Sequence, residues 1–163
     1  MKRFTARPPE SVSELCLVRL GIQARGIRGL IYARRAGRAI QREARAAIAA
    51  DAGLLHSESF LINLGHFGVL QYWRSFAELE AWSHKGPHAE WWREASERMR
   101  SRGDFGIYHE TYLVPRERIE AIYANCEPAG LAAFGETGEP VGNDTNSRGR
   151  LGRGIKAGGG ERT

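Results

Sequence analysis

The sequence has few cysteines, no long hydrophobic run and no apolar stretch near its start. Two cysteines are too few for a disulfide scaffold. The longest apolar stretches, such as Phe60 to Leu64, are far shorter than the roughly 20 residues that span a bilayer. The charged first ten residues lack the apolar core of an export signal. We therefore expect a cytoplasmic protein without a membrane span.

Motifs of several common enzyme classes are also absent. The sequence contains no glycine-rich phosphate loop, no Cys-x-x-Cys cluster, no nucleophile elbow and no paired carboxylates at a catalytic spacing. This weakens hydrolase and nucleotide-binding interpretations. His84 and His88 are four residues apart, but Gly86-Pro87 breaks the helix on which both would have to lie. We therefore expect no metal site.

The basic charge is concentrated near the end of the sequence. The formal net charge is +5, but residues 141–163 hold five basic and only two acidic side chains. The predicted first long helix adds seven arginines, which we interpret as spread around the helix rather than forming one stripe: Arg25, Arg28, Arg34, Arg35, Arg38, Arg42 and Arg45. A nucleic-acid partner is therefore not expected, although a basic surface alone would favour one.

Length and composition indicate one folded domain with flexible ends. The chain has 163 residues, of which 42% are hydrophobic and 26% charged, as in average globular proteins. Residues 1–11 contain a Pro-Pro pair and predict a flexible lead. Residues 136–163 are rich in glycine and poor in apolar side chains, which predicts a disordered basic tail. The folded domain is expected over residues 12–135.

Hydrophobic patterning within that domain predicts the element order β, α, β, β, α, β. The expected elements are a strand at 13–20, a helix at 25–50, strands at 59–63 and 69–74, a two-part helical region at 75–83 and 88–102, and a strand at 104–114. Ser75 and Glu78 have the spacing of a capping box at the second helix. This order is typical of the ferredoxin-like α+β fold, an antiparallel sheet with both helices on one face. A second copy is expected to cover the other face, forming a homodimer.

The predicted last strand carries an unusual run of polar and aromatic residues, Tyr108 to Tyr112. Neutral imidazole at His109 can act as a general base, a haem ligand or a hydrogen-bond partner, or it can be a structural histidine. His88 and Trp92 share a helix face, so His88 can face a pocket between helix and sheet. The catalytic candidates are His88, His109, Tyr72 and Arg74. Arg74 can alternatively form a buried ion pair with Glu110.

Several segments resemble one superfamily of small proteins. They are FLINLGHFGVLQYWRS at 60–75, YWRSFAELEAWSHKGPHAEWW at 72–92, GIYHETY at 106–112 and IYANCEPAGLAAF at 122–134. The pattern is similar to that of the dimeric α+β barrel superfamily, within its monooxygenase-like or phenylacetaldoxime-dehydratase-like branch. The resemblance covers roughly residues 12 to 135.

The resemblance implies a homodimer with a pocket between each sheet and its helices. Members of the superfamily oxidise polyketide quinols without a cofactor, degrade haem, or dehydrate aldoximes as haem enzymes. Trp73 and Trp82 fit the spacing of the haem-degrading members, but Trp92 stands where those members have an axial histidine. Any haem iron would therefore need His88 or His109 as its ligand. The expected pocket walls are Trp73, Trp82, Trp92 and Tyr108.

The sequence thus predicts a monooxygenase-like oxidoreductase that acts on a small, largely apolar molecule, with either no cofactor or haem. One alternative is a haem-binding lyase like the aldoxime dehydratases. The other is a small-molecule-binding module without catalysis.

Overall fold

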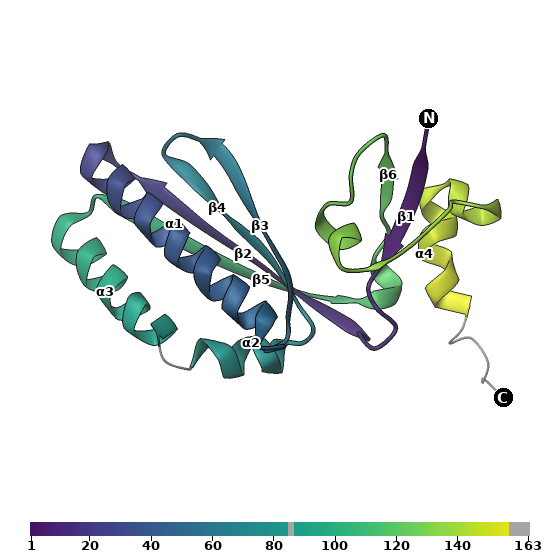
Figure 1. The fold of residues 1–163 in the computed structure, drawn as a ribbon, viewed down its shortest axis with the longest axis horizontal. Coiled ribbons are helices and arrows are strands. Elements are labelled where there is room, and N and C mark those ends of the chain that lie inside the picture. Colours follow the sequence, from purple (N-terminus) through teal and green to yellow (C-terminus); the bar gives the residue numbers. More distant parts are fainter. Residues whose placement is uncertain (85–86, 157–163) are drawn as a thin grey trace. The chain divides into compact units, whose positions relative to one another are not determined.

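The computed structural model describes residues 1–84 and 87–156 (Figure 1). The chain divides into two compact units, a central unit of Cys16–Tyr112 and a terminal unit of Met1–Leu15 with Leu113–Thr163. This division differs from the single domain predicted over residues 12–135. No helix in the described part of the chain has the length and hydropathy needed to cross a bilayer.

The central unit has the ferredoxin-like α+β topology that the sequence predicts. Its elements are β2 (Glu14–Ala24), α1 (Gly26–Ala49), β3 (Leu54–Asn63), β4 (His66–Trp73), α2 (Phe76–Ser83), α3 (Pro87–Arg102) and β5 (Phe105–Pro115). The four strands form one sheet in the order β3-β4-β2-β5. β4 pairs antiparallel with both β2 and β3. β2 and β3 are consecutive in the chain, but β4 lies between them in the sheet. The chain therefore crosses the sheet between β2 and β3, and this connection contains α1.

Local sequence signals account for the helix boundaries. The Ser75 hydroxyl accepts a hydrogen bond from the backbone amide of Glu78 at 3.2 Å and donates one to its carboxylate at 3.0 Å. This confirms the predicted capping box at the start of α2. α1 continues through Gly37 without interruption, because packing against the sheet outweighs the low helix propensity of one glycine.

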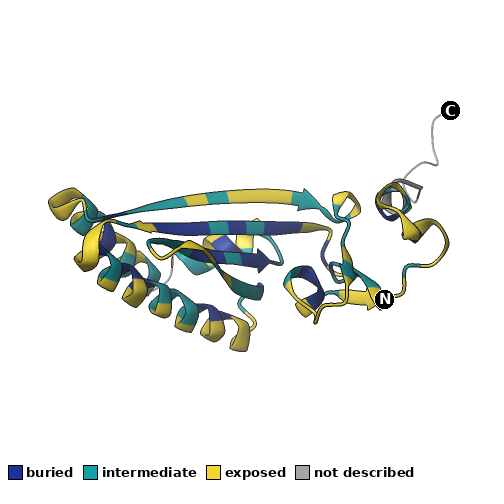
Figure 2. Cartoon of the chain, turned by 90° about the horizontal axis from the view of Figure 1, so that it is seen from above, coloured by how far each residue is buried: buried dark blue, intermediate teal, exposed yellow. Residues whose placement is uncertain are grey.

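The described helices of the central unit cover one face of its sheet, and none of them lies on the other face, which we call the helix-free face. Figure 2 shows α1 and α3 on the same side of the strands. In the register, Val18 lies opposite Gln71 and Arg19 lies opposite Leu70. Because side chains alternate along a strand, Val18 and Gln71 point to the covered face, while Arg19 and Leu70 point to the helix-free face.

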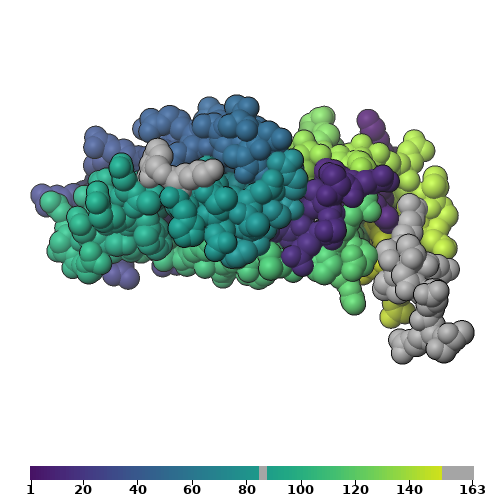
Figure 3. Space-filling model, turned by 90° about the horizontal axis from the view of Figure 1, so that it is seen from below, coloured from purple at the N-terminus to yellow at the C-terminus, as the bar shows by residue number. Residues whose placement is uncertain are grey.

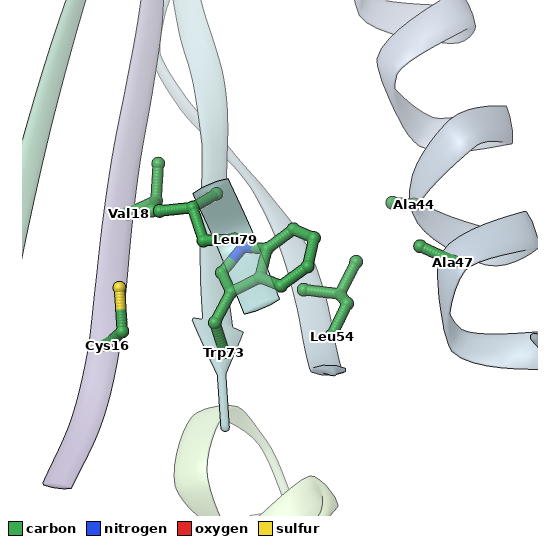
Figure 4. Close-up of a cluster of buried hydrophobic side chains, with 7 residues drawn as sticks. All are labelled: Cys16, Val18, Ala44, Ala47, Leu54, Trp73 and Leu79. Atoms are coloured by element: carbon green, nitrogen blue, oxygen red, sulfur yellow. The ribbon is translucent and has the colours of Figure 1, made fainter. Parts of the chain in front are cut away.

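A core of small and large apolar side chains fills the space beneath the helices. Trp73 is fully buried, and its indole nitrogen donates a hydrogen bond to the Gln71 side chain at 3.1 Å. Figure 4 shows the surrounding side chains, which come from two strands and two helices: Cys16, Val18, Ala44, Ala47, Leu54 and Leu79. Ala44 and Ala47 are small, which allows α1 to approach the sheet closely.

The terminal unit contains a small second sheet. It is formed by β1 (Arg3–Arg7), β6 (Ile122–Ala124) and β7 (Glu136–Gly138), with β1 in the middle and both pairings antiparallel. The rings of Phe4 and Tyr123 stack across it with centroids 4.8 Å apart. The pairing of β1 on both of its edges differs from the flexible lead predicted for residues 1–11.

Structure also continues beyond residue 136, where the sequence predicts a disordered tail. A short 3-10 helix occurs there at Gly142–Thr145, and α4 spans Ser147–Lys156; two other 3-10 helices, at Arg116–Arg118 and Gly130–Ala133, come before this segment. The buried Arg150 forms an ion pair with Glu120 at 2.6 Å and donates a hydrogen bond to the carbonyl of Asp144 at 2.8 Å. These contacts, which composition cannot reveal, hold the segment. Residues 157–163 of the predicted tail lie outside the described residues.

Candidate functional site

A cavity of about 230 Å³ lies between the covered face of the sheet and the three helices of the central unit. Seven aromatic or imidazole side chains line it: Phe76, Trp82, His84, His88, Trp91, Trp92 and His109. Apolar side chains of β2 and α1, among them Val18, Leu20 and Ile40, complete the wall. In the space-filling view, atoms of α1 (blue) lie next to those of α2 and α3 (teal) over this region (Figure 3). The cavity is therefore a largely apolar space with imidazole groups in its wall.

The connection between α3 and β5 explains why His88 and His109 face the same cavity. α3 ends at Arg102 and β5 begins at Phe105, so the chain reverses direction within two residues. His88 lies in the first turn of α3, and His109 lies in the middle of β5. At the usual rise per residue of a helix and a strand, His88 lies roughly 20 Å and His109 roughly 15 Å from that reversal. The helix and the strand thus both run back from the reversal to the same cavity, which both histidines line.

An ion pair fixes this reversal. Arg98 of α3 contacts the Asp104 carboxylate through two nitrogens, at 3.1 and 2.6 Å. The same guanidinium lies 4.3 Å from the centre of the Tyr32 ring of α1. A bidentate ion pair stacked on an aromatic ring is geometrically specific. It holds α3 in position over the sheet.

Both imidazoles favour the neutral form. Partial burial lowers the pKa of His88, and the neighbouring His109 lowers it further. Partial burial also lowers the pKa of His109, although this residue remains accessible to solvent. A charged imidazole loses hydration when it is buried, which is why the neutral form is preferred. Among the described residues, neither ring has a hydrogen-bond partner or an ion pair, so both can bind a ligand.

A row of aromatic rings leads from the core to the cavity. Trp73 packs against Trp82 with centroids 5.3 Å apart, and Trp82 packs against His88 at 4.8 Å. Trp91 and Trp92 continue the row, with centroids 6.2 Å apart. The rings hold His88 in place and give the cavity flat, apolar walls.

Four of the eight predicted site residues line the cavity: His88, His109, Trp82 and Trp92. Trp73 instead belongs to the buried core. Tyr72 and Tyr108 belong to the helix-free face, where Tyr72 bonds Glu58 at 3.5 Å and Tyr108 bonds His66 at 3.0 Å. Tyr72 and Tyr108 therefore cannot reach a ligand in this cavity.

Arg74 lies at the end of β4 and forms ion pairs with Asp51 at 3.0 Å and Glu78 at 2.9 Å. Glu110 pairs instead with Arg19, at 3.2 Å. The alternative of a buried Arg74–Glu110 ion pair is therefore wrong. Arg74 links β4, the start of α2 and the end of α1, so its role in the structure is to hold these segments together.

Sequence reasoning missed most of the other cavity residues, among them an aromatic and an acidic side chain. Trp91 precedes Trp92 and shares the cavity wall with it, although we predicted only Trp92. Glu43 of α1 also lines the cavity, and burial raises the pKa of its carboxyl group. The signal in the sequence that could have identified Glu43 is its position next to Ala44, which the structure shows to be buried.

Comparisons with known proteins support this architecture. Residues 15–131 match the family described as monooxygenase af470-like. Among solved structures, an aldoxime dehydratase is similar with a TM-score of 0.63 and 20% identity, over 85% of this chain and 39% of that chain. A second, the aldoxime dehydratase OxdRE in complex with butyraldoxime, gives a TM-score of 0.64 and 20% identity, over 91% of this chain and 42% of that chain. No curated protein sequence matches the chain. The chain thus spans about two fifths of the length of these dehydratases, and at this identity the likeness concerns the fold.

Proposed function

Because the chain belongs to the monooxygenase af470-like family, we propose that it is a monooxygenase-like oxidoreductase acting on a small, largely apolar molecule in the cavity between sheet and helices. The observation that carries this proposal is the placement of two neutral imidazoles, from α3 and from β5, in the wall of one apolar cavity.

The imidazoles supply the acid–base chemistry. A neutral imidazole accepts a proton at neutral pH, and a lowered pKa keeps it in that state when the solution becomes mildly acidic. Removal of a proton from a substrate hydroxyl or an activated C–H group leaves an electron-rich anion in the cavity. Such an anion is the form of the substrate that dioxygen can oxidise. The indole rings of Trp82 and Trp92 hold the apolar body of the substrate.

The test uses a water-soluble apolar quinol, 1,4-dihydroxynaphthalene, and measures protein-dependent oxygen uptake above the spontaneous rate. We expect His88→Ala and His109→Ala each to lower that rate at least about tenfold, since positioned general bases contribute roughly 10²–10⁴-fold. Tyr72→Phe, on the helix-free face, is the control and should retain the rate. Unchanged oxygen uptake in both histidine variants would remove this site from the reaction.

A haem-binding, aldoxime-dehydratase-like lyase is the second candidate. It is supported by the similarity in fold to aldoxime dehydratases and by the arrival of His88 and His109 from a helix and a strand at one cavity. The donor set fits haem, because neutral imidazole is a common axial ligand of iron. The volume fits less well: about 230 Å³ lies below the ~300–1,000 Å³ usual for pockets of larger ligands, so the half-exposed Trp92 would have to turn outward.

Haem, when bound, would supply a Lewis-acidic, redox-active iron, and His88 or His109 would hold it. The other imidazole would then remain free to exchange a proton with the substrate. Titration of the purified protein with haem, followed by absorbance spectroscopy, separates the two candidates. A Soret band that is lost in one histidine variant supports the lyase, and the absence of any band eliminates it.

We further propose that two copies associate through their helix-free faces. The aldoxime dehydratases are more than twice as long as the part of them that this chain matches, which leaves room for a second similar unit. Within the central unit, no described helix covers Leu70 and its neighbours on the sheet. Sedimentation should report a dimer, Leu70→Asp should dissociate it, and Arg93→Asp on the exposed surface of α3 should not. A monomeric wild-type chain would contradict the proposal.

A further inference from the structure

A second concave surface of the central unit lies on the other side of α1, between this helix and the β3–β4 hairpin. This α1 groove has a volume of about 650 Å³. Its floor is apolar and includes Leu20, Ile22, Phe67 and Val69 from the covered face of the sheet. Gly37 of α1 faces the Phe67 ring, and a Cβ atom at this position would lie only 3.2 Å from it. The small residue thus keeps the groove open along the helix.

The upper edge of the α1 groove is strongly basic. Arg34, Arg38, Arg42 and Arg45 all line it. Positions 34, 38, 42 and 45 fall within one stripe of a helix with 3.6 residues per turn. Four of the seven arginines that we predicted to be spread around α1 therefore share one side, and the sequence-based interpretation is wrong for these four.

These cations form no ion pairs within the described part of the chain, although the charge of Arg42 acts on the neighbouring Glu43 carboxyl group. No aspartate or glutamate lines the α1 groove, and none of the four arginines forms an ion pair with a described residue. The polar contact across the groove is a neutral one, from the Gln41 amide to the Ser59 hydroxyl at 2.9 Å. Four like charges beside an apolar floor repel one another and attract an anion.

We propose that the α1 groove binds a small amphipathic carboxylate, with its acidic group at the arginines and its apolar body on the sheet floor. Guanidinium groups bind carboxylates through paired, charge-assisted hydrogen bonds. The apolar body gains from burial against Phe67 and Val69. Leu20 and Ile40 line both this groove and the imidazole cavity. A long apolar body in the groove therefore lies against the same two side chains that bound the proposed reaction site.

The concave shape distinguishes this occupant from a membrane. A basic amphipathic helix can also lie on an anionic bilayer, but it then presents a convex apolar face to the lipid. Here most apolar residues of the groove lie on the sheet, behind the arginines, and Ile40 of α1 is only partly exposed. The exception is Leu61, which is 68% exposed at the hairpin.

Calorimetric titration of the full chain with decanoate tests the proposal, and decyltrimethylammonium, which has the same apolar tail and the opposite charge, is the matched probe. Decanoate should bind at least about tenfold more tightly than the cation. The double variant Arg38→Gln/Arg42→Gln should weaken decanoate binding at least about tenfold, since charged hydrogen bonds contribute more than neutral ones. Arg35→Gln is the control: Arg35 is exposed on the same helix but does not line the groove, and its loss should change the affinity less than twofold.

Three results would overturn the proposal. They are equal affinity for the two probes, an unchanged affinity in the double variant, and association with phosphatidylserine vesicles without decanoate binding, which would assign the arginines to a membrane surface. His88→Ala/His109→Ala should retain decanoate binding, because neither histidine lines the α1 groove. Failure of the proposed oxidation is thereby distinguishable from failure of this inference.

Discussion

The two faces of the central sheet are built from the same strands but treat polar groups in opposite ways. On the helix-free face, polar side chains pair with one another. Arg19 forms an ion pair with Glu110, and Tyr108 bonds His66. On the covered face, Gln71 accepts a hydrogen bond from Trp73, but the imidazoles of His88 and His109 in the cavity wall have no such partners among the described residues. Available hydrogen-bonding capacity therefore marks the covered face as the site.

The histidines show the contrast most directly. His66 shares a hydrogen bond with the Tyr108 hydroxyl, and His56 lies 3.7 Å from the Glu58 carboxylate. These contacts satisfy the rings within the protein. His88 contacts aromatic rings instead, and burial lowers its pKa. A histidine that is partly buried without a polar partner costs stability unless a ligand completes its hydrogen bonds, which is typical of a functional site.

The largest expected effect is a difference in the free energy of unfolding between substitutions on the two faces of the sheet, because the covered face is more closely packed. Trp73→Ala removes a fully buried indole from the covered face and should lower the free energy of unfolding by about 3–5 kcal/mol. Tyr112→Ala, on the helix-free face where Tyr112 is half exposed, should cost less than about 1 kcal/mol. Urea unfolding followed by circular dichroism measures both. Similar losses would mean that the helix-free face is as closely packed as the core, as in a stable dimer.

The second effect concerns the close packing of rings on the helix-free face. The Tyr108 ring lies directly over Gly21, where a Cβ atom would overlap it. Gly21→Ala should therefore displace the ring, break its bond to His66 and cost about 1–3 kcal/mol, as overpacking does. Gly106→Ala on β5 is the matched control, because nothing lies within 4 Å of the added atom. Thermal unfolding of both variants checks the difference, and an equal change in the two would show that the ring moves freely.

The arrangement of the central unit could be predicted from sequence because its signals are local. Alternation marks the strands, and the Ser75–Glu78 capping box marks α2. The covered and helix-free faces were harder to assign. Tyr72 and Trp73 are neighbours, and only the strand register shows that Trp73 faces the core and Tyr72 the opposite side. A shift of one residue exchanges the two faces, so the prediction placed Tyr72 in the site.

Contacts between distant segments could not be predicted at all. β1 pairs with strands more than a hundred residues away, and Arg150 is held by Glu120. Neither pairing leaves a periodic signal in the sequence. The His88–His109 pair was partly predictable, because the short Gly103–Asp104 connection makes α3 and β5 run back alongside each other. The arginine stripe of α1 could be found from the spacing of Arg34, Arg38, Arg42 and Arg45 in the sequence. We missed it because we considered all seven arginines of the helix as one set.

The third effect is a difference in pH dependence. The folded-state pKa values of His88 and His109 are lowered by burial, so below the unfolded pKa of about 6.5 the unfolded chain binds protons that the folded chain does not. Stability should therefore fall as the pH decreases from 7 to 5. The fall should be smaller in His88→Gln/His109→Gln, and His56→Gln on the helix-free side is the control. Melting temperatures at pH 7.5 and 5.5 measure it, and identical slopes in wild type and double variant would show that the imidazoles are not buried.

The smallest effect is expected at the ion pair of the helix-free face. Arg19 and Glu110 are each about 40% exposed, so water screens their attraction, and Arg19→Gln should cost less than about 1 kcal/mol. The Arg19 guanidinium also lies 5.3 Å from the centres of the Phe60 and Tyr108 rings. Arg19→Lys keeps the charge but loses the planar stacking, so the two variants separate ion pairing from ring contact. The measurement is urea unfolding at low and at 1 M salt, at protein concentrations where the chain is monomeric. A large loss in the free energy of unfolding that does not depend on salt would mean that Arg19 is shielded from water in the single chain. The two faces would then differ in the pairing of their polar groups and not in the exposure of those groups.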